Sequence, residues 1–257
     1  MKQLYMLMVA MVLAGCGGGG GSNNSPSPPA NQSVGGIWEG VDSDGDDIIG
    51  LIAENGFFHF IDDFGQAFGI AAVSNGNQVD ASYTYVANLG TVLFDGSTSA
   101  DCTLSGTIVE RQTLTVAANC TTTLGSTSQV TASLAYNSLY ERNASLATIA
   151  GQYSDFGDVI TIDNTGALFE QSATTACVLN GQISVINPEY NAYGVEFTVG
   201  GCGAGFTELN GTSWSGIGAL DNSDSSTPEE LVFGVTGDVT ISGVTATFAL
   251  IIVAPRI

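Results

Sequence analysis

The sequence predicts an all-β protein with two related antiparallel β-meander units, each a small barrel or sandwich, after a disordered leash. Glycine accounts for 34 of the 257 residues, and threonine, valine, isoleucine and aromatic residues supply much of the remainder. This composition favours short strands and tight turns over helices. The pairs Asp44-Gly45, Asn55-Gly56 and Asn75-Gly76 are of the kind that two-residue hairpin turns prefer. One ordered series of short motifs also occurs twice along the chain.

The N-terminal residues 1–15 predict a signal peptide. Met1-Lys2 is a short basic start, and the apolar run that follows is too short to span a bilayer as a helix. Leu13-Ala14-Gly15-Cys16 resembles the lipobox of bacterial lipoproteins. That resemblance implies cleavage before Cys16 and acylation of Cys16, and several acyl chains are enough for stable anchoring. In many Gram-negative lipoproteins an Asp after the Cys signals inner-membrane retention. Gly17 stands there instead, so the resemblance favours the outer membrane, with the protein periplasmic or surface-exposed.

Residues 16–33 predict a flexible, lipidated linker. A glycine run at 17–21 leads into a Ser- and Pro-rich segment, and neither composition can build a core. At about 5–6 Å times the square root of length, roughly 17 residues reach on the order of 20–25 Å. The linker would therefore hold the folded units just clear of the lipid. A glycine-rich leash after the lipidated Cys also resembles several surface-exposed Gram-negative lipoproteins.

The chain is strongly acidic, with 25 Asp and Glu against four Lys and Arg and a formal net charge of −21. Cleavage before Cys16 would remove Lys2 and leave Arg111, Arg142 and Arg256 as the only Lys or Arg residues. Such a chain is repelled by phosphate backbones and by anionic lipid headgroups. We therefore expect no nucleic-acid partner and no hold on the membrane except the lipid on Cys16. The acidity fits calcium, a basic partner or a solvated surface.

Four cysteines remain once Cys16 is assigned to lipid, and an exported chain is expected to form disulfides. Of three connectivities, the local pattern favours one, because each pair lies on two alternating strands joined by a turn. The sequence thus predicts Cys102–Cys120 and Cys177–Cys202, each worth about 3 kcal/mol in the chain-entropy model. A metal site on these cysteines is disfavoured, since the chain has no Cys-x-x-Cys and one His.

An internal duplication divides the rest of the chain into a first β unit at 34–142 and a second at 143–257. Each series of matches ends on a short tail that contains an arginine, Arg142 or Arg256. The matches pair residues 35–38 with 150–153, 47–49 with 158–160, 52–58 with 162–168, the two Cys-x-Leu-x-Gly segments at 102–106 and 177–181, and 131–134 with 245–248.

Alternation of apolar and polar residues between the turns predicts a meander of short strands in each unit. In the first unit we expect strands at 36–41, 47–53, 57–61, 67–73, 78–86, 91–94, 102–110, 113–119 and 129–136. In the second we expect them at 151–154, 158–163, 168–171, 177–186, 194–199, 207–209, 216–220, 230–235 and 245–253. One helical turn is expected at 143–149. Small barrels of this kind are filled by their own side chains or hold one ligand.

No catalytic residue is predicted. His59, the only histidine, has no nucleophile motif beside it and is interpreted as a structural or rim residue. The segment 211–216 has a serine where the nucleophile elbow requires its second glycine, and it reads as a turn that enters a strand. The many acidic residues single out no carboxylate pair for glycoside cleavage.

Calcium is the one candidate cofactor, at Asp42, Asp44 and Asp46. Alternating Asp residues around Gly45 supply the oxygen ligands that a hard cation prefers. The segment departs from the EF-hand, since its glycine comes fourth and its twelfth residue is Ala53. The alternative is a solvated hairpin turn. A calcium-induced thermal shift that substitution of these three residues abolishes would support the site.

The two-unit region resembles, in pattern, secreted Gram-negative lipoproteins with tandem β domains of unassigned function. Trp38-Glu39-Gly40, the Cys-x-Leu-x-Gly strands and Ser145-Leu146-Ala147 carry this resemblance. The first hypothesis is a non-enzymatic envelope lipoprotein that binds another macromolecule or has a structural role. The second is a lipocalin-like carrier of a small apolar ligand, with Trp38, Tyr153 and the aromatic residues at 57–60 facing a cavity. A hydrolase is the least favoured. An interior filled by side chains would argue against the carrier.

Overall fold

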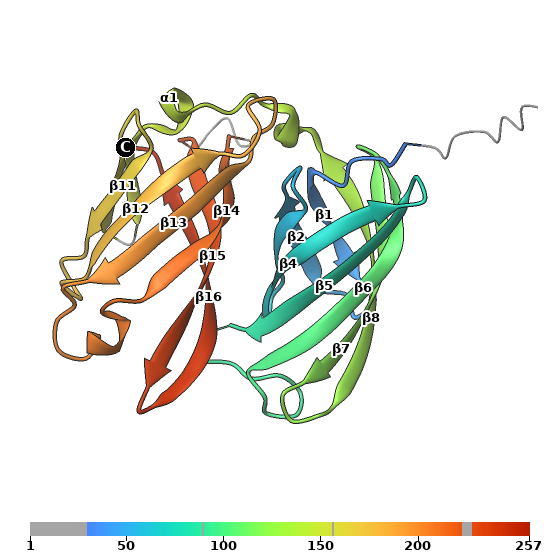
Figure 1. Cartoon of the computed structure of the whole chain (residues 1–257), viewed down its shortest axis with the longest axis horizontal. Coiled ribbons are helices and arrows are strands. Elements are labelled where there is room, and N and C mark those ends of the chain that lie inside the picture. The colour runs from blue at the N-terminus through green and yellow to red at the C-terminus, as the bar shows by residue number, and fades with distance from the viewer. Residues whose placement is uncertain (1–29, 89, 156, 223–227) are drawn as a thin grey trace, which may run out of the picture.

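The computed structural model describes residues 30–88, 90–155, 157–222 and 228–257. The predicted signal peptide, Cys16 and most of the linker lie outside these described residues. The described chain is all-β and forms two antiparallel eight-stranded sheets, one after the other in sequence (Figure 1). Within the described ranges, no helix has the length and apolar character needed to cross a membrane.

The first sheet is a closed up-and-down barrel. Each strand pairs with the next along the chain, and β1 also pairs with β8, which closes the cylinder. Its strands are β1 (Gly36–Asp42), β2 (Asp47–Ile52), β3 (Phe57–Ile61), β4 (Gly65–Ser74), β5 (Gln78–Ala87), β6 (Ser99–Val109), β7 (Thr113–Thr122) and β8 (Thr127–Asn137).

The second sheet has the same strand order but remains a half-barrel. Its two edges are joined by an isolated bridge between Tyr153 and Arg256 and by a hydrogen bond from the Ile257 N–H to the Gln152 carbonyl at 3.0 Å, rather than by a ladder. Its strands are β9 (Gly151–Asp155), β10 (Asp158–Ile162), β11 (Ala167–Gln171), β12 (Val178–Val185), β13 (Tyr193–Gly200), β14 (Ser213–Asp221), β15 (Glu230–Ile241) and β16 (Val244–Pro255).

Two short helical segments connect the sheets, η1 (Ser138–Glu141) and α1 (Leu146–Ile149). The helical turn expected at 143–149 is therefore present as α1. Ser145 caps it, since its Oγ accepts a hydrogen bond from the Thr148 N–H at 3.0 Å, and serine is a preferred residue at that position.

Two predicted strands are wrong. Residues 91–94 form a loop, where the Thr91 N–H bonds to the Asn88 carbonyl and the Leu93 N–H to the Ser97 carbonyl. Residues 207–209 form a 3-10 turn, η2 (Thr207–Leu209), within a loop in which Gly205 and Gly211 have positive φ values. In both segments local hydrogen bonds satisfy backbone groups that a strand would offer to its neighbours.

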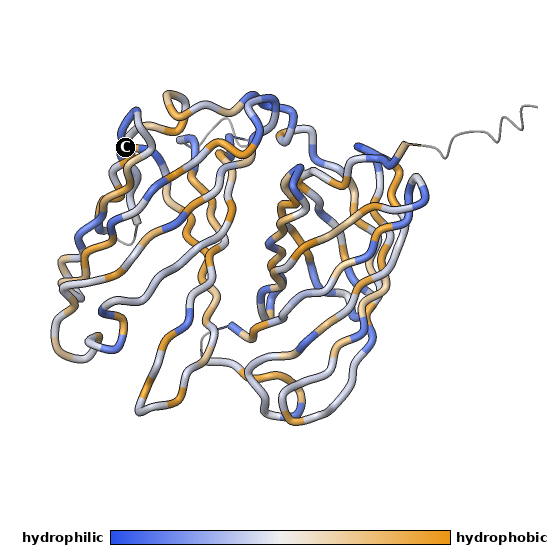
Figure 2. Tube along the Cα trace, in the orientation of Figure 1, coloured by the Kyte–Doolittle hydropathy of each residue, from blue (hydrophilic) through white to orange (hydrophobic). Residues whose placement is uncertain are grey.

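The start of each unit is built in the same way. Trp38 and Tyr153 are both fully buried, and each donates a hydrogen bond to the carbonyl four residues upstream, at 3.1 Å and 2.7 Å. Gly56 and Gly166 have φ values of 86° and 84° in the turn between the second and third strands. The carbonyl of each glycine accepts a hydrogen bond from a backbone N–H group of the unit's fourth strand. The two units thus share these local features, and the duplication stays a prediction. Apolar and polar residues alternate along many strands of both units (Figure 2).

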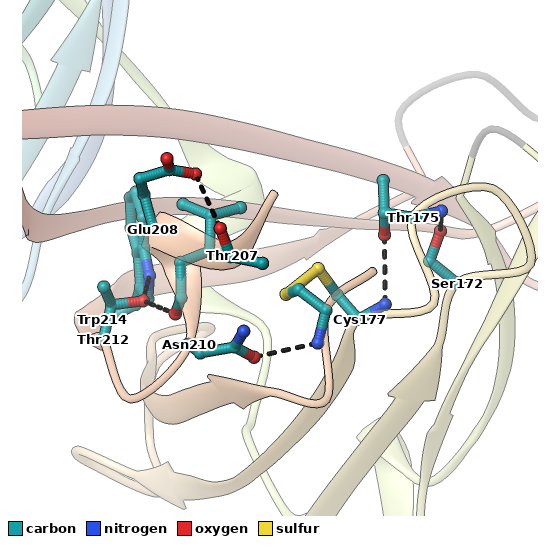
Figure 3. Close-up of a disulfide and its surroundings, with 10 residues drawn as sticks. Ser172, Thr175, Cys177, Thr207, Glu208, Asn210, Thr212 and Trp214 are labelled. Carbon is teal, nitrogen blue, oxygen red and sulfur yellow. Dashed lines mark hydrogen bonds between the residues drawn. A yellow bond between two sulfur atoms is a disulfide. The ribbon is translucent and has the colours of Figure 1, made fainter. Parts of the chain in front are cut away.

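The two predicted disulfides are present. Cys102–Cys120 joins β6 to β7, and Cys177–Cys202 joins the residues that flank β12 and β13. The backbone N–H groups of Cys177 and Cys202 donate to Thr175 Oγ1 and Asn210 Oδ1 (Figure 3). The disulfides do not occupy equivalent strands, because they lie on the sixth and seventh strands of the first unit and the fourth and fifth of the second. The proposed match between the two Cys-x-Leu-x-Gly segments is thus not a structural equivalence.

The outer faces of the two sheets pack against each other. Ile37 and Leu51 of the barrel share a buried apolar cluster with Ile217 and Ala219 of β14. Asn191 fastens this junction, since its side chain exchanges hydrogen bonds with the Leu220 backbone at 2.8 and 3.0 Å and donates to the Leu139 carbonyl.

All three arginines of the predicted mature chain take part in ion pairs. Arg142 and Arg256, the arginines at the two repeat ends, bind opposite oxygens of Glu229 at 2.5 and 2.8 Å. Arg111 pairs with Glu141 at 3.0 Å. Because Arg142 and Arg256 share Glu229, the C-terminal ends of the two units are linked through one carboxylate.

Candidate functional site

The first barrel encloses a cavity of about 620 Å³. Its volume comes from small residues on the inward register of the strands. Gly40, Gly50 and Gly69 lie on this inward register, each two residues from a side chain that lines the cavity. The wall also contains six alanines, Ala67, Ala71, Ala81, Ala100, Ala118 and Ala132. Eight-stranded barrels have just enough interior for side chains or one small ligand, so small side chains leave room for a ligand.

The end of the barrel where β1 begins is closed. Trp38, Val79 and Ile108 fill it and are at most 1% exposed. The indole ring of Trp38 packs edge-on against Tyr136, with 5.4 Å between the ring centroids. The interior is therefore inaccessible from this side.

The chain that enters the barrel also covers this closed end. The Asn31 side chain bonds to the Val73 carbonyl at 2.7 Å and to the Gly76 N–H at 3.0 Å. The Gln32 side chain accepts a bond from the Glu110 N–H at 2.7 Å. The described part of the chain thus begins at the closed end, opposite the cavity mouth.

The opposite end is the mouth. The connection between β1 and β2 brings Asp42, Asp44 and Asp46 to the cavity, and the connection between β3 and β4 brings Asp62 and Phe64. Phe64 is 58% exposed although it lines the cavity. The mouth is thus both acidic and apolar.

Two of these carboxylates are held in place by their own turns. Asp42 Oδ1 accepts hydrogen bonds from the N–H groups of the next turn, including Asp44 at 2.8 Å and Asp46 at 3.0 Å. Asp62 Oδ1 accepts the Phe64 N–H at 2.8 Å and the Tyr85 hydroxyl at 2.7 Å. Such Asx turns fix the carboxylates at the rim.

The mouth favours positive charge. Partial burial, and next the negative charge of Asp42 and other neighbouring aspartates, raises the pKa of Asp46 above its ordinary value. Burial raises the pKa of Tyr83 to about 12, and burial together with the hydrogen bond to Asp62 raises the pKa of Tyr85. Both phenols therefore stay neutral at physiological pH, while the carboxylates concentrate negative potential at one end of the barrel.

The loop between β5 and β6 lies at the mouth and contributes Val92, Leu93 and Phe94 to the cavity wall. Asp95 fastens it, since its carboxylate accepts bonds from the Ser97 hydroxyl and from the Thr122 hydroxyl at the end of β7. These two hydrogen bonds hold the pKa of Asp95 well below its usual value.

The aspartates predicted as calcium ligands therefore line the cavity mouth. One carboxylate oxygen of Asp42 already accepts hydrogen bonds from backbone N–H groups of its own turn. Within the described part of the chain, no group of three or more His, Cys, Asp or Glu side chains is placed to hold a metal ion. The calcium site stays a prediction.

Of the aromatic residues expected to face a cavity, only some do so in the structure. Phe58 and Phe60 line it, whereas Phe57 is 51% exposed on the outside of the barrel. Trp38 plugs the closed end, and Tyr153 lies in the core of the second unit. The sequence patterns do not single out the alanines or Tyr83, whereas they indicate Asp62 only as a further candidate calcium ligand. Alanines at alternate positions of the predicted strands were the available signal for the hollow interior.

His59 lies at the junction of the two units rather than in the cavity. It is 6% exposed, and its Nε2 is 2.9 Å from Gln66 Oε1. The Gln66 side chain in turn donates to the Ala249 carbonyl of β16 at 3.2 Å. Burial lowers the pKa of His59. This placement agrees with a structural role.

Comparison with known proteins yields no match, either to protein-family models or to curated sequences.

Proposed function

We propose that this protein is a non-enzymatic, lipid-anchored binding protein of the Gram-negative outer membrane whose first barrel takes up a small, largely apolar ligand. The observation that supports this most directly is the cavity of about 620 Å³, apolar along its wall and open at one end. Small-molecule sites in proteins typically measure about 300–1,000 Å³ and combine apolar walls with a few polar groups. The anchor rests on the lipobox at Cys16.

The size of the cavity supports a ligand over a packing defect. At roughly 24 cal/mol per Å³ of void, a dry space of this size would cost about 15 kcal/mol. That is as much as the whole stability of a typical domain, about 5–15 kcal/mol. Solvent or a ligand must therefore occupy the interior, and an apolar molecule that displaces this solvent gains the hydrophobic contribution.

The second unit supports the barrel and carries no comparable role in this proposal. Its interior is packed by large side chains, among them Tyr193, Phe197, Trp214 and Phe233. Its outer face covers one side of the barrel. We therefore assign ligand binding to the first unit.

Ligand uptake is testable with two alanine substitutions. Ala118→Phe places a ring in the cavity, whereas Ala135→Phe places the same ring on the exposed outer face of β8. The ring takes up volume that a ligand would occupy, so we expect Ala118→Phe to weaken binding of a fluorescent apolar probe about tenfold or more. Ala135→Phe should leave it unchanged.

Native mass spectrometry of protein purified from its host is the complementary measurement. We expect one small apolar molecule per chain, displaced by the probe. If the parent chain carries no such molecule and binds no apolar probe, the carrier proposal is wrong.

A further inference from the structure

The ligand's polar end can be inferred from the mouth of the cavity, on the condition that the barrel is the binding site proposed above. Four carboxylates, those of Asp42, Asp44, Asp46 and Asp62, line the mouth, and the cavity-lining residues among those described include no Lys, Arg or His. The arginines lie elsewhere and are paired with Glu141 and Glu229. The ring of acids is thus not neutralised by the described basic residues of the chain.

The cavity beneath these acids is an independent feature that points to a ligand. Directly inside the mouth the wall becomes apolar, with Ile48, Phe60 and Ala67. A molecule that fills the interior must therefore present a polar end, if it has one, to the four aspartates. A carboxylate or sulfate at that end would meet like charge, which costs binding energy at short range.

Aromatic side chains stand beside the acids. Phe64 and Phe94 line the mouth and remain largely exposed, and the Tyr85 ring is part of the wall. Aromatic faces attract alkylammonium groups, and recognition of quaternary ammonium by aromatic rings is an established use of this interaction. The described lining of the mouth thus combines two kinds of group that favour a cation and contains no Lys, Arg or His.

We propose that the barrel binds a cationic amphiphile, with an apolar body in the cavity and an amine or quaternary ammonium group at the mouth between the aspartates. Negative potential at the mouth would also raise the association rate of such a ligand at low salt.

Three decyl compounds with the same tail test this proposal. Decyltrimethylammonium, decanol and decanoate are compared by displacement of a fluorescent apolar probe, below their micelle concentrations. We expect the cation to bind about tenfold more tightly than the alcohol at low salt, and the carboxylate to bind most weakly. The preference should shrink as the Debye length falls from about 30 Å at 0.01 M salt to about 8 Å at 0.15 M.

Charge-neutralising variants locate the effect. Asp44→Asn with Asp46→Asn removes two charges from the mouth, whereas Asp80→Asn with Asp101→Asn removes two from the outer faces of β5 and β6. We expect the mouth variant to reduce the cation preference about three- to tenfold without changing decanol affinity. The control should keep most of the preference.

The outcomes separate this proposal from the one on which it rests. If all three compounds bind equally, or decanoate binds best, the cationic head is wrong and the apolar carrier stands. If the two double variants lose the preference equally, the net charge of the chain and not the mouth is responsible, which overturns the proposal. If none of the compounds binds, the carrier function itself fails.

Discussion

Gly234 is the position at which one added methyl group should weaken the packing between the two units. A Cβ placed there would lie 2.3 Å from Cγ and 2.5 Å from Nδ1 of His59, far inside van der Waals contact. The His59 ring cannot easily retreat, because Nε2 is bonded to Gln66 at 2.9 Å and the ring packs against Phe68. Overpacking of this kind costs about 1–3 kcal/mol. We therefore expect Gly234→Ala to destabilise the junction by that amount while leaving the interiors of the barrel and of the half-barrel intact.

The assay is urea unfolding followed by tryptophan fluorescence, since Trp38 reports on the first unit and Trp214 on the second. Gly200→Ala is the matched control, because a Cβ at Gly200 meets no atom within 4 Å. In a strand that substitution should be neutral or stabilising by about 0.5–1 kcal/mol. His59→Ala removes the ring, so the double variant with Gly234→Ala should be less destabilised than the two single effects added together, by about 1 kcal/mol or more. Strictly additive effects would refute the contact.

Two further predictions concern pH and the anchor. Burial lowers the pKa of His59 below 6.5, so the unfolded chain binds more protons near that pH; stability should be full above pH 6.5 and fall as the pH drops toward the folded pKa. His59→Gln should lose this component, and equal pH profiles of unfolding for the two chains would contradict it. Cys16→Ser should move the protein from the membrane fraction to the soluble periplasmic fraction, and recovery in the same membrane fraction would count against the lipid anchor.

Local chemistry is what the sequence predicts well here. Asn75 and Gly76 have φ values of 50° and 89°, the positive pair that an Asn-Gly hairpin turn requires. The cysteine pairing follows from the same logic, because neighbouring strands of a hairpin bring residues into register. Cys102 faces Cys120 directly in the ladder between β6 and β7. Turn chemistry and alternation were thus enough to identify most strands and both disulfides.

The pairing of strands that are far apart in the sequence could not be predicted from local patterns. β1 meets β8 along a ladder from Ile37 with Asn137 to Asp42 with Ala132, whereas the edges of the second sheet are joined by the isolated bridge between Tyr153 and Arg256 rather than by a ladder. No local pattern separates these two outcomes. The close contact between His59 and Gly234 could not be predicted either, because Gly234 lies in the other unit, far away in the sequence. The volume of the cavity depends on inward residues summed over all eight strands, which no single segment reveals.

The two units show how one topology gives a hollow barrel and a filled half-barrel. On the fourth and fifth strands of the first unit the inward residues include Ala67, Ala71 and Ala81. On the corresponding strands of the second they include Ile183, Tyr193 and Phe197, at most 5% exposed. Large side chains that fill an interior contribute about 1.5–3 kcal/mol each, a stabilisation that the first barrel forgoes at its alanines. This difference between two units of the same strand order supports the proposal that the first barrel keeps its interior open for a ligand.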